Sequence, residues 1–428
     1  MQSTGTPDGT VDGATDGATT NDGGGNPCGA PLDTDPKNCG ACGHVCGTDN
    51  TISAPTCAAG KCVLQCKAGY DNCDADGSKG CETALTSDNA RACGSCGRDC
   101  LEGTCTNYQC STVTVFSVPA GQNLHDVAVD GTHVYWTQDY ADENPTDAGA
   151  CTAPEGGIYR SEPDGGDRAL LASNEHPLEV GVDDAGVYFK SNDKCGSTVA
   201  GSFRRIGKDG KCSTGACPST LGNVTFLTDD LGVRAGNVYF FDSTNNLLYA
   251  VRTAGAPPLP PSIADSFHAY QEQLAPDSVG VVWTTENNQG SGKPAILGLS
   301  VDSSSGVVTE GAKTLVVPES KPLAIASDGA TVYYGTADAI YSVPRNGGAA
   351  TKVSGAESPY AIAVDDDAIY WTSPTTTNSV LRIGKDGTCR NGSCPEVLAT
   401  GGQPHQIAVD AVAVYWLDGN SKILKVGK

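Results

Sequence analysis

The chain has few of the residues from which long helices, membrane spans and basic surfaces are built. Of its 428 residues, only 18% are charged and 6% are aromatic, and there is a single methionine. Lysine and arginine number 27 against 50 acidic residues, so the formal net charge at pH 7 is −23. This balance excludes nucleic acid as a partner, because binding a phosphate backbone needs a basic surface. No apolar run approaches the roughly 18 residues of a transmembrane segment, so none is expected to cross a bilayer.

Glycine, proline and cysteine, by contrast, are abundant, at 54, 24 and 20 residues. An even number of cysteines at regular spacings is typical of disulfides formed in an oxidising compartment. We therefore expect an exported protein, located extracellularly or on the outer cell surface. The first residues, Met1 to Gly5, have neither the basic nor the apolar region of a signal peptide. We expect either that a signal peptide has been removed or that Met1 begins an engineered mature form.

Composition divides the chain into three segments. Residues 1–27 consist almost entirely of Gly, Asp, Thr, Ala and Asn without a hydrophobic period, which predicts a disordered linker. Residues 28–110 contain 14 of the 20 cysteines but only two aromatic residues. Such a segment lacks the apolar mass for a core and is expected to depend on disulfides. Residues 111–428 carry 24 of the 26 aromatic residues and are expected to form the main folded domain.

The cysteine-rich segment contains two copies of one six-cysteine spacing. The copies are Cys28, Cys39, Cys42, Cys46, Cys57 and Cys62, and then Cys81, Cys93, Cys96, Cys100, Cys105 and Cys110. Cys66 and Cys73 are left over and could pair with each other, but the connectivity within 28–110 cannot be read from the sequence. The Cys-x2-Cys-x3-Cys core would also fit a zinc or iron–sulfur site. Export and the even count favour disulfides.

A repeated motif marks residues 111–428. An apolar run ends in Asp, and an aromatic pair begins five residues later, as at Asp130 before Tyr135 and Trp136. The Asp recurs at positions 130, 183, 277, 328, 365 and 410, and a seventh unit has Arg234 in its place. An alternating segment, a turn and a short apolar segment follow each pair, so each unit predicts four short strands.

Seven units in residues 111–428 have a mean length of about 45 residues, which is typical of propeller blades. The predicted fold class is therefore all-β: a seven-bladed β-propeller with four-stranded blades, preceded by a small disulfide-rich region. The last unit ends at Lys428 after its third strand. We expect residues 112–116 to supply the missing fourth strand, which would close the ring and leave no exposed edge.

These units resemble the repeats of YWTD- and NHL-type β-propellers. Val134–Thr137 and Ile369–Thr372 are close to the YWTD motif, although the fourth-position Asp is absent and receptor propellers usually have six units. The cysteine-rich segment is similar to repeats in exported, often lipid-anchored surface proteins of bacteria. The resemblance implies an exported bacterial surface protein, whose precursor could carry a lipid anchor. It is specific for architecture only, because propellers serve binding, scaffolding and catalysis alike.

Catalytic signals are sparse. The sequence has no Gly-x-Ser-x-Gly elbow, no His-Glu-x-x-His zinc helix and no phosphate-binding Gly-Lys-Ser/Thr loop. We therefore expect a cell-surface binding module rather than an enzyme, with a protein, a peptide or a glycan as its partner. The alternative is a metal-dependent propeller enzyme, a lyase or hydrolase, with its site at the central channel.

The residues that lead each first strand are expected to ring one mouth of the channel, because the first strands line it. Counting back five residues from each Asp position gives His125, Leu178, Asp229, Glu272, Leu323, Tyr360 and His405. His125, Asp229, Glu272 and His405 are the expected ligands of a divalent metal such as Ca or Zn, or an acid and base set. Tyr360 and His176 are expected to join them in binding a ligand. The alternative is a polar, water-filled entrance.

Six cysteines lie among the propeller units. Cys212 with Cys217, and Cys389 with Cys394, follow the same Ile-Gly-Lys-Asp-Gly phrase and are each expected to close a short loop. Cys151 and Cys195 lie between second and third strands of neighbouring units, so we expect them to bridge two long loops on one face.

Overall fold

The structure is a computed structural model, and it describes most of the chain from residue 28 onward. The described residues are 28–74, 76–85, 89–140, 156–192, 201–212, 217–224, 227–234, 236–242, 247–252, 263–264, 273–286, 292–302, 304, 307–355, 358–390 and 394–428. They form two compact units that divide between Ala84 and Leu85. The described residues contain no helix, so none is long and apolar enough to cross a membrane.

The first unit is a set of hairpins and turns cross-linked by disulfides. Its strands are β1 (Thr56–Ala58), β2 (Lys61–Val63), β3 (Tyr70–Asp71) and β4 (Thr83–Ala84), paired β1 with β2 and β3 with β4. Its disulfides join Cys28 to Cys42, Cys39 to Cys57, Cys46 to Cys62 and Cys66 to Cys81. No described cysteine is free. The zinc or iron–sulfur alternative therefore lacks the thiolates it would need.

The pairing of Cys66 with Cys73 is wrong, because Cys66 is bonded to Cys81. Both Cys66 and Cys81 contact the backbone of the segment 49–51. Thr51 forms a bridge with Cys66, and the carbonyl of Asp49 accepts a hydrogen bond from the amide of Cys81 at 2.7 Å. The two cysteines are thus brought together by backbone contacts to a third segment, which cysteine spacing does not reveal.

The second cysteine repeat, apart from Cys81 in the first unit, belongs to the same compact unit as the propeller. It contains β5 (Cys105–Thr106) and β6 (Gln109–Cys110). Its disulfides Cys93–Cys105 and Cys100–Cys110 occupy the same repeat positions as two bonds of the first unit. All four sulfur-bearing residues are buried in one cluster with apolar residues of two propeller blades.

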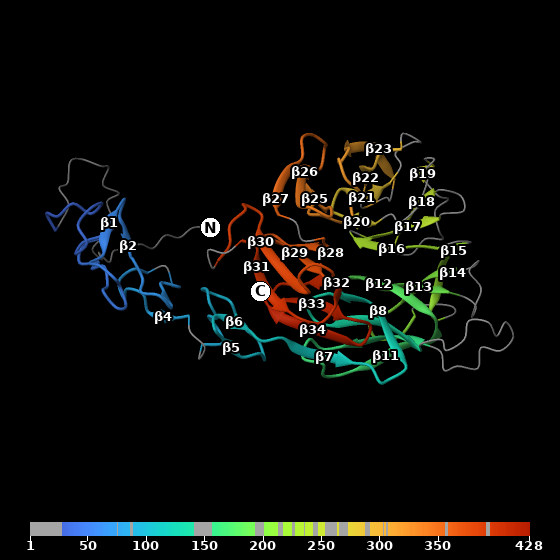
Figure 1. The fold of residues 1–428 in the computed structure, drawn as a ribbon, viewed down its shortest axis with the longest axis horizontal. Coiled ribbons are helices and arrows are strands. Elements are labelled where there is room, and N and C mark those ends of the chain that lie inside the picture. The colour runs from blue at the N-terminus through green and yellow to red at the C-terminus, as the bar shows by residue number, and fades with distance from the viewer. Residues whose placement is uncertain are drawn as a thin grey trace, which may run out of the picture. The chain divides into compact units, whose positions relative to one another are not determined.

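The propeller consists of seven four-stranded antiparallel sheets (Figure 1). Blade 1 is β8 (Gln122–Val129), β9 (Val134–Tyr140), β10 (Gly156–Ser161) and β11 (Ala169–Glu175). Blade 2 is β12 (Pro177–Asp183), β13 (Gly186–Asn192), β14 (Gly201–Ile206) and β15 (Ser219–Val224). Blade 3 is β16 (Leu227–Arg234), β17 (Asn237–Asp242), β18 (Leu247–Arg252) and β19 (Ile263–Ala264). Blade 4 is β20 (Leu274–Pro276), β21 (Gly280–Thr285), β22 (Ala295–Val301) and β23 (Val308–Val316).

The remaining blades follow the same order. Blade 5 is β24 (Ala324–Ser327), β25 (Thr331–Gly335), β26 (Ile340–Pro344) and β27 (Thr351–Ser354). Blade 6 is β28 (Ala361–Val364), β29 (Ala368–Ser373), β30 (Ser379–Gly384) and β31 (Glu396–Thr400). Blade 7 is β32 (Pro404–Val409), β33 (Ala413–Asp418), β34 (Lys422–Gly427) and β7 (Val113–Ser117).

The first strands form the inner ring of the propeller. Each packs against the first strand of the next blade, and β32 of blade 7 packs against β8 of blade 1. The predicted closure of the ring is confirmed, because β7 pairs antiparallel with β34, with Phe116 opposite Ile423. The fourth strand of the last blade therefore comes from the start of the propeller segment.

The hydrophobic core is divided into one cluster for each interface between neighbouring blades. The two aromatic residues of a second strand enter two different clusters, because consecutive strand residues point to opposite faces of the sheet. Tyr135 lies in the cluster between blades 1 and 2, whereas Trp136 lies in the cluster between blades 7 and 1. Both side chains are fully buried. The paired aromatics of the sequence motif are therefore the means by which one strand contacts both of its neighbours.

Deletion of Val113–Ser117 should cost much more stability than removal of an equal number of residues from the segment 1–27. The deletion exposes the edge of β34 and removes Val115 from the core between blades 7 and 1. We expect an insoluble protein, or a fall in melting temperature of more than about 10 °C. A soluble deletion variant that melts at the wild-type temperature would show that closure through β7 does not stabilise the ring.

Candidate functional site

The Asp that ends a first strand forms hydrogen bonds with the turn between the first and second strands of its blade, and with the second strand itself. In blade 1, Oδ1 of Asp130 accepts backbone hydrogen bonds from Thr132 and His133 at 2.9 and 2.8 Å. Its Oδ2 accepts a hydrogen bond from the hydroxyl of Tyr135 at 2.9 Å. The carboxylate thus fixes the tight turn and also anchors the aromatic residue on the next strand. This double role explains the five-residue spacing in the sequence.

The same carboxylates form ion pairs between blades. A cation that follows the third strand of one blade contacts the Asp of the preceding blade at four interfaces. The pairs are Lys208–Asp130 at 2.8 Å, Arg345–Asp277 at 2.7 Å, Lys385–Asp328 at 2.7 Å and Lys428–Asp365 at 2.5 Å. Burial alone would raise the pKa of Asp328, but the hydrogen bond from Lys385 and two backbone amides hold that pKa below its usual value.

The Thr that follows the aromatic pair also joins neighbouring blades, next to the expected site. Thr372 Oγ1 accepts a hydrogen bond from the amide of Ala361 at 3.2 Å and donates one to the carbonyl of His405 at 2.6 Å. Thr137 similarly donates to the carbonyl of Leu178 at 3.2 Å. Two of the seven expected ring positions are therefore held in place by their backbones, which leaves their side chains available.

Three residues of the expected ring lie on blades 6, 7 and 1, which are neighbours. The ring of Tyr360 lies 4.9 Å from that of His405, tilted by 54°. Tyr360 is 46% exposed. His125, on β8, directs Nε2 to within 2.7 Å of Oδ1 of Asp139, which sequence reasoning did not identify. Asp139 lies at the end of the second strand, where the sequence motif carries no distinguishing residue.

The other expected site residues are less fully described. His176 lies between β11 and β12 and is partly buried. The side chain of Asp229, all of Glu272, and the expected Cys151–Cys195 bond lie outside the described residues. Within the described part of the chain, the only groups with metal-ligand spacing are cysteines already engaged in disulfides. The metal set of His125, Asp229, Glu272 and His405 remains a prediction. Cys212 is bonded to Cys217, and Cys389 to Cys394.

Two further carboxyl groups lie one position along from the expected ring. Burial raises the pKa of Asp126 to about 7, although it accepts backbone hydrogen bonds from Val180 at 3.0 Å and Val127 at 2.8 Å. Burial, together with the negative charge of Asp126, also raises the pKa of Asp230 to about 7. Both groups are therefore protonated more readily than an exposed carboxyl group. They could have been found in the sequence by counting back four residues instead of five.

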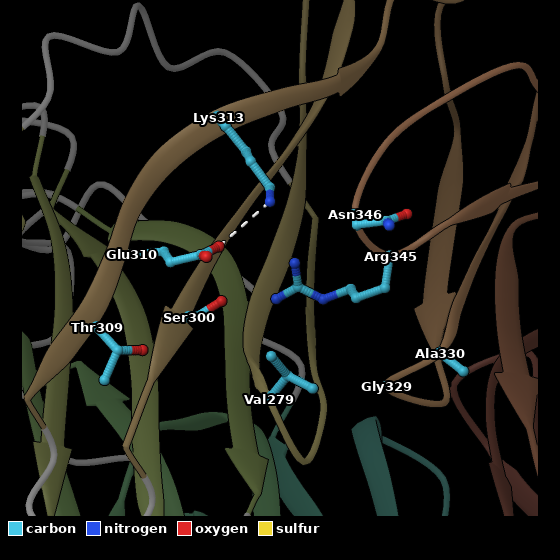
Figure 2. Close-up of a pocket in the computed structure, with 9 residues that line it drawn as sticks. All are labelled: Val279, Ser300, Thr309, Glu310, Lys313, Gly329, Ala330, Arg345 and Asn346. Carbon is cyan, nitrogen blue, oxygen red and sulfur yellow. Dashed lines mark hydrogen bonds and ion pairs between the residues drawn. The ribbon is translucent and has the colours of Figure 1, made fainter.

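A separate open cleft of about 710 Å³ lies between blades 4 and 5 (Figure 2). It is lined by Val279, Ser300, Thr309, Glu310, Lys313, Gly329, Ala330, Arg345 and Asn346. The guanidinium of Arg345 lies across its middle and is bonded to Asp277. A Cβ at Gly298 would sit 2.6 Å from Nη1 of Arg345, so that glycine leaves the space which the guanidinium uses. The floor of the cleft is thus one of the inter-blade ion pairs.

No protein-family model matches the chain, and no curated protein matches it. Among solved structures it is similar to virginiamycin B lyase from Staphylococcus aureus, with 14% identity and a TM-score of 0.50 over 74% of this chain and 98% of that one. It is also similar to BamB from Moraxella catarrhalis, with 10% identity and a TM-score of 0.45 over 76% and 94% of the two chains. At these identities the likeness shows the propeller fold alone.

Replacement of Lys385 by Met should destabilise the propeller by about 1 kcal/mol at pH 7, since it leaves a partly buried Asp328 carboxylate without its cation. The pKa of Asp328 is lowered in the folded state, so the pair stabilises the fold above the unfolded pKa of about 4. That contribution is lost as the pH falls through the folded value. Urea unfolding from pH 7 to pH 3 measures the difference. The exposed Lys352→Met is the control, expected within about 0.5 kcal/mol of wild type. A Lys385→Met deficit that is as large at pH 3 as at pH 7 would contradict the role of the ion pair.

Proposed function

We propose that the protein is an exported cell-surface binding module, which takes its ligand at the channel mouth ringed by the leading residues of the first strands. The observation that carries the proposal is the exposed ring of Tyr360 beside that of His405. An aromatic ring that is half exposed on a rigid scaffold contributes contact area with little loss of conformational entropy on binding. His125 leads the first strand of blade 1, next to blade 7, and adds a polar side chain together with Asp139.

The chemistry of the mouth suits a polar ligand with an apolar face. Tyr360 and His405 provide flat surfaces, and His125 and Asp139 provide a polar nitrogen and a carboxylate oxygen. A glycan, a peptide or a protein loop could meet these requirements. The net charge of −23 disfavours a strongly acidic ligand. The disulfide-bonded cysteines support an oxidising, extracellular location for the proposed encounter.

The second candidate function is a metal-dependent lyase or hydrolase at the same mouth. It is favoured by the 2.7 Å approach of His125 Nε2 to Asp139 Oδ1, since an imidazole beside a carboxylate is a common arrangement for a general base or a metal ligand. In that case His125, His405, Asp229 and Glu272 would hold a divalent ion such as Ca or Zn. The ion would polarise a bound carbonyl or activate water.

Two variants test the mouth against both candidates. Tyr360→Ala and the double variant His125→Ala/His405→Ala should each lower binding on glycan and peptide arrays by at least about tenfold, because each removes contacts of the bound ligand. The control is Val412→Ala, in the exposed turn between β32 and β33. Melting temperatures should stay within about 3 °C of wild type, as these side chains are outside the core clusters.

Elemental analysis after chelator-free purification separates the two functions. A binding module keeps its array signal without bound metal. A stoichiometric divalent ion that the double histidine variant loses would favour the enzyme. If array binding survives both mouth variants, the proposed binding surface is wrong.

A further inference from the structure

The second cysteine repeat is attached to the propeller through a buried charge cluster. Arg98 has no exposed surface, and its Nη1 donates to Oε1 of Glu396 on β31 at 2.9 Å. Arg382 on β30 is also buried, and its Nη1 lies 3.6 Å from Oε2 of the same carboxylate. Two buried guanidinium groups therefore share a single carboxylate, which leaves an excess of one positive charge.

The same cluster has donors without acceptors. An arginine side chain carries five N–H donors and remains charged under physiological conditions. Within the described residues, Nε and Nη2 of Arg98 and Nε of Arg382 have no hydrogen-bond partner. Buried donors are nearly always satisfied by protein, water or an ion. Water would satisfy the donors but would leave the excess charge, whereas an anion removes both costs.

Further charges of both signs surround the cluster. Burial lowers the pKa of Arg98, Glu396 partly opposes this shift, and the positive charges of Arg390 and Arg382 lower the pKa further. Arg382 and Arg390 also line an open cleft of about 370 Å³, together with acidic residues of the β28–β29 and β30–β31 turns. Of the buried cluster, Arg382 alone reaches this cleft.

The first cysteine repeat provides an internal comparison. Its residue at the position of Arg98 is His44, which is partly exposed. The His44 ring contacts the carbonyl of Cys39 and the carboxylate of Asp76 within its own unit. A buried guanidinium at this position therefore belongs to the repeat that contacts the propeller, and is not needed for the disulfide framework itself.

We infer that a small monoanion of the halide class, with chloride as the physiological form, binds beside Arg98 and Arg382 and stabilises the attachment of the second cysteine repeat to blades 6 and 7. A monoatomic ion suits a place where Arg98 has no exposed surface, because it needs no room for further atoms. It would accept the free N–H groups and balance the extra positive charge. This site is distinct from the channel mouth and does not depend on its function.

Thermal unfolding of the intact oxidised chain in sodium chloride, against sodium gluconate at equal sodium concentration, tests the site. Because the sodium concentration is equal, the general screening of the net negative charge is the same in both salts. Above the dissociation constant, the melting temperature should rise by about 2–4 °C for each tenfold increase in chloride, with no comparable rise in gluconate. Equal melting in the two salts would overturn the proposal.

Three variants locate the effect. Arg98→Met and Arg382→Met each leave one guanidinium opposite one carboxylate, so each should lose the chloride dependence. Arg160→Met is the matched control. Arg160 faces Tyr135 across β10 and β9 as Arg382 faces Tyr370 across β30 and β29. This variant should keep the chloride dependence, and its loss there would contradict the assignment.

Bromide identifies the place directly, even if a variant fails to fold. Crystals of the wild-type protein grown in sodium bromide should give an anomalous scattering peak within hydrogen-bonding distance of Arg98 Nε or Nη2. An ordered structure without a peak at that place would overturn the proposal.

Discussion

The carboxylate that ends six of the seven first strands, and pairs with a cation of the next blade at four interfaces, is the contact on which the arrangement of the blades depends. Apolar packing holds the blades together, but it is non-directional and does not fix how far one blade turns relative to the next. The Asp130 carboxylate fixes the turn of its own blade and accepts a hydrogen bond from Lys208 of the next. At the interface between blades 3 and 4 the Asp is replaced by Arg234, and the position that carries the cation at four other interfaces is the buried Val301. Asp410 and Asp183 are kept although the matching positions of the next blades are Pro163 and Thr253, so the carboxylate also occurs without the cation.

Much of the fold could be predicted because its determinants are local. Asp, the aromatic pair and the turns lie within a few residues of one another, so their spacing survives in the sequence even where the blades diverge. The strand Val113–Ser117 was predictable by counting strands, since the last blade had only three strands of its own and needed a fourth. The bond between Cys66 and Cys81 was not, because a backbone segment far from both brings them together.

The candidate site likewise contains residues that local spacing predicts and residues that it does not. The register of the repeat predicts which residues lead the first strands, and it places Tyr360 and His405 on neighbouring blades. It does not predict Asp139, which lies on a second strand and reaches His125 only through the pairing of β8 with β9. Nor does a five-residue count reveal Asp126, whose pKa near 7 arises from burial between blades. Side chains defined by contact across strands or blades carry no periodic signal.

The second cysteine repeat and the closure of the ring act on the same blade. Cys110 is bonded to Cys100, and β7 begins three residues later at Val113. Glu102 of the repeat contacts Lys425 of β34 at 2.5 Å, and Asp99 approaches so closely that a Cβ at Gly427 would clash with its carbonyl oxygen. The repeat thus holds the start of β7 beside the strand with which it must pair. This arrangement shortens the free chain whose ends must meet, and so lowers the entropic cost of closing the propeller. The contacts of the repeat with β34 and the pairing of β7 with β34 therefore support one another.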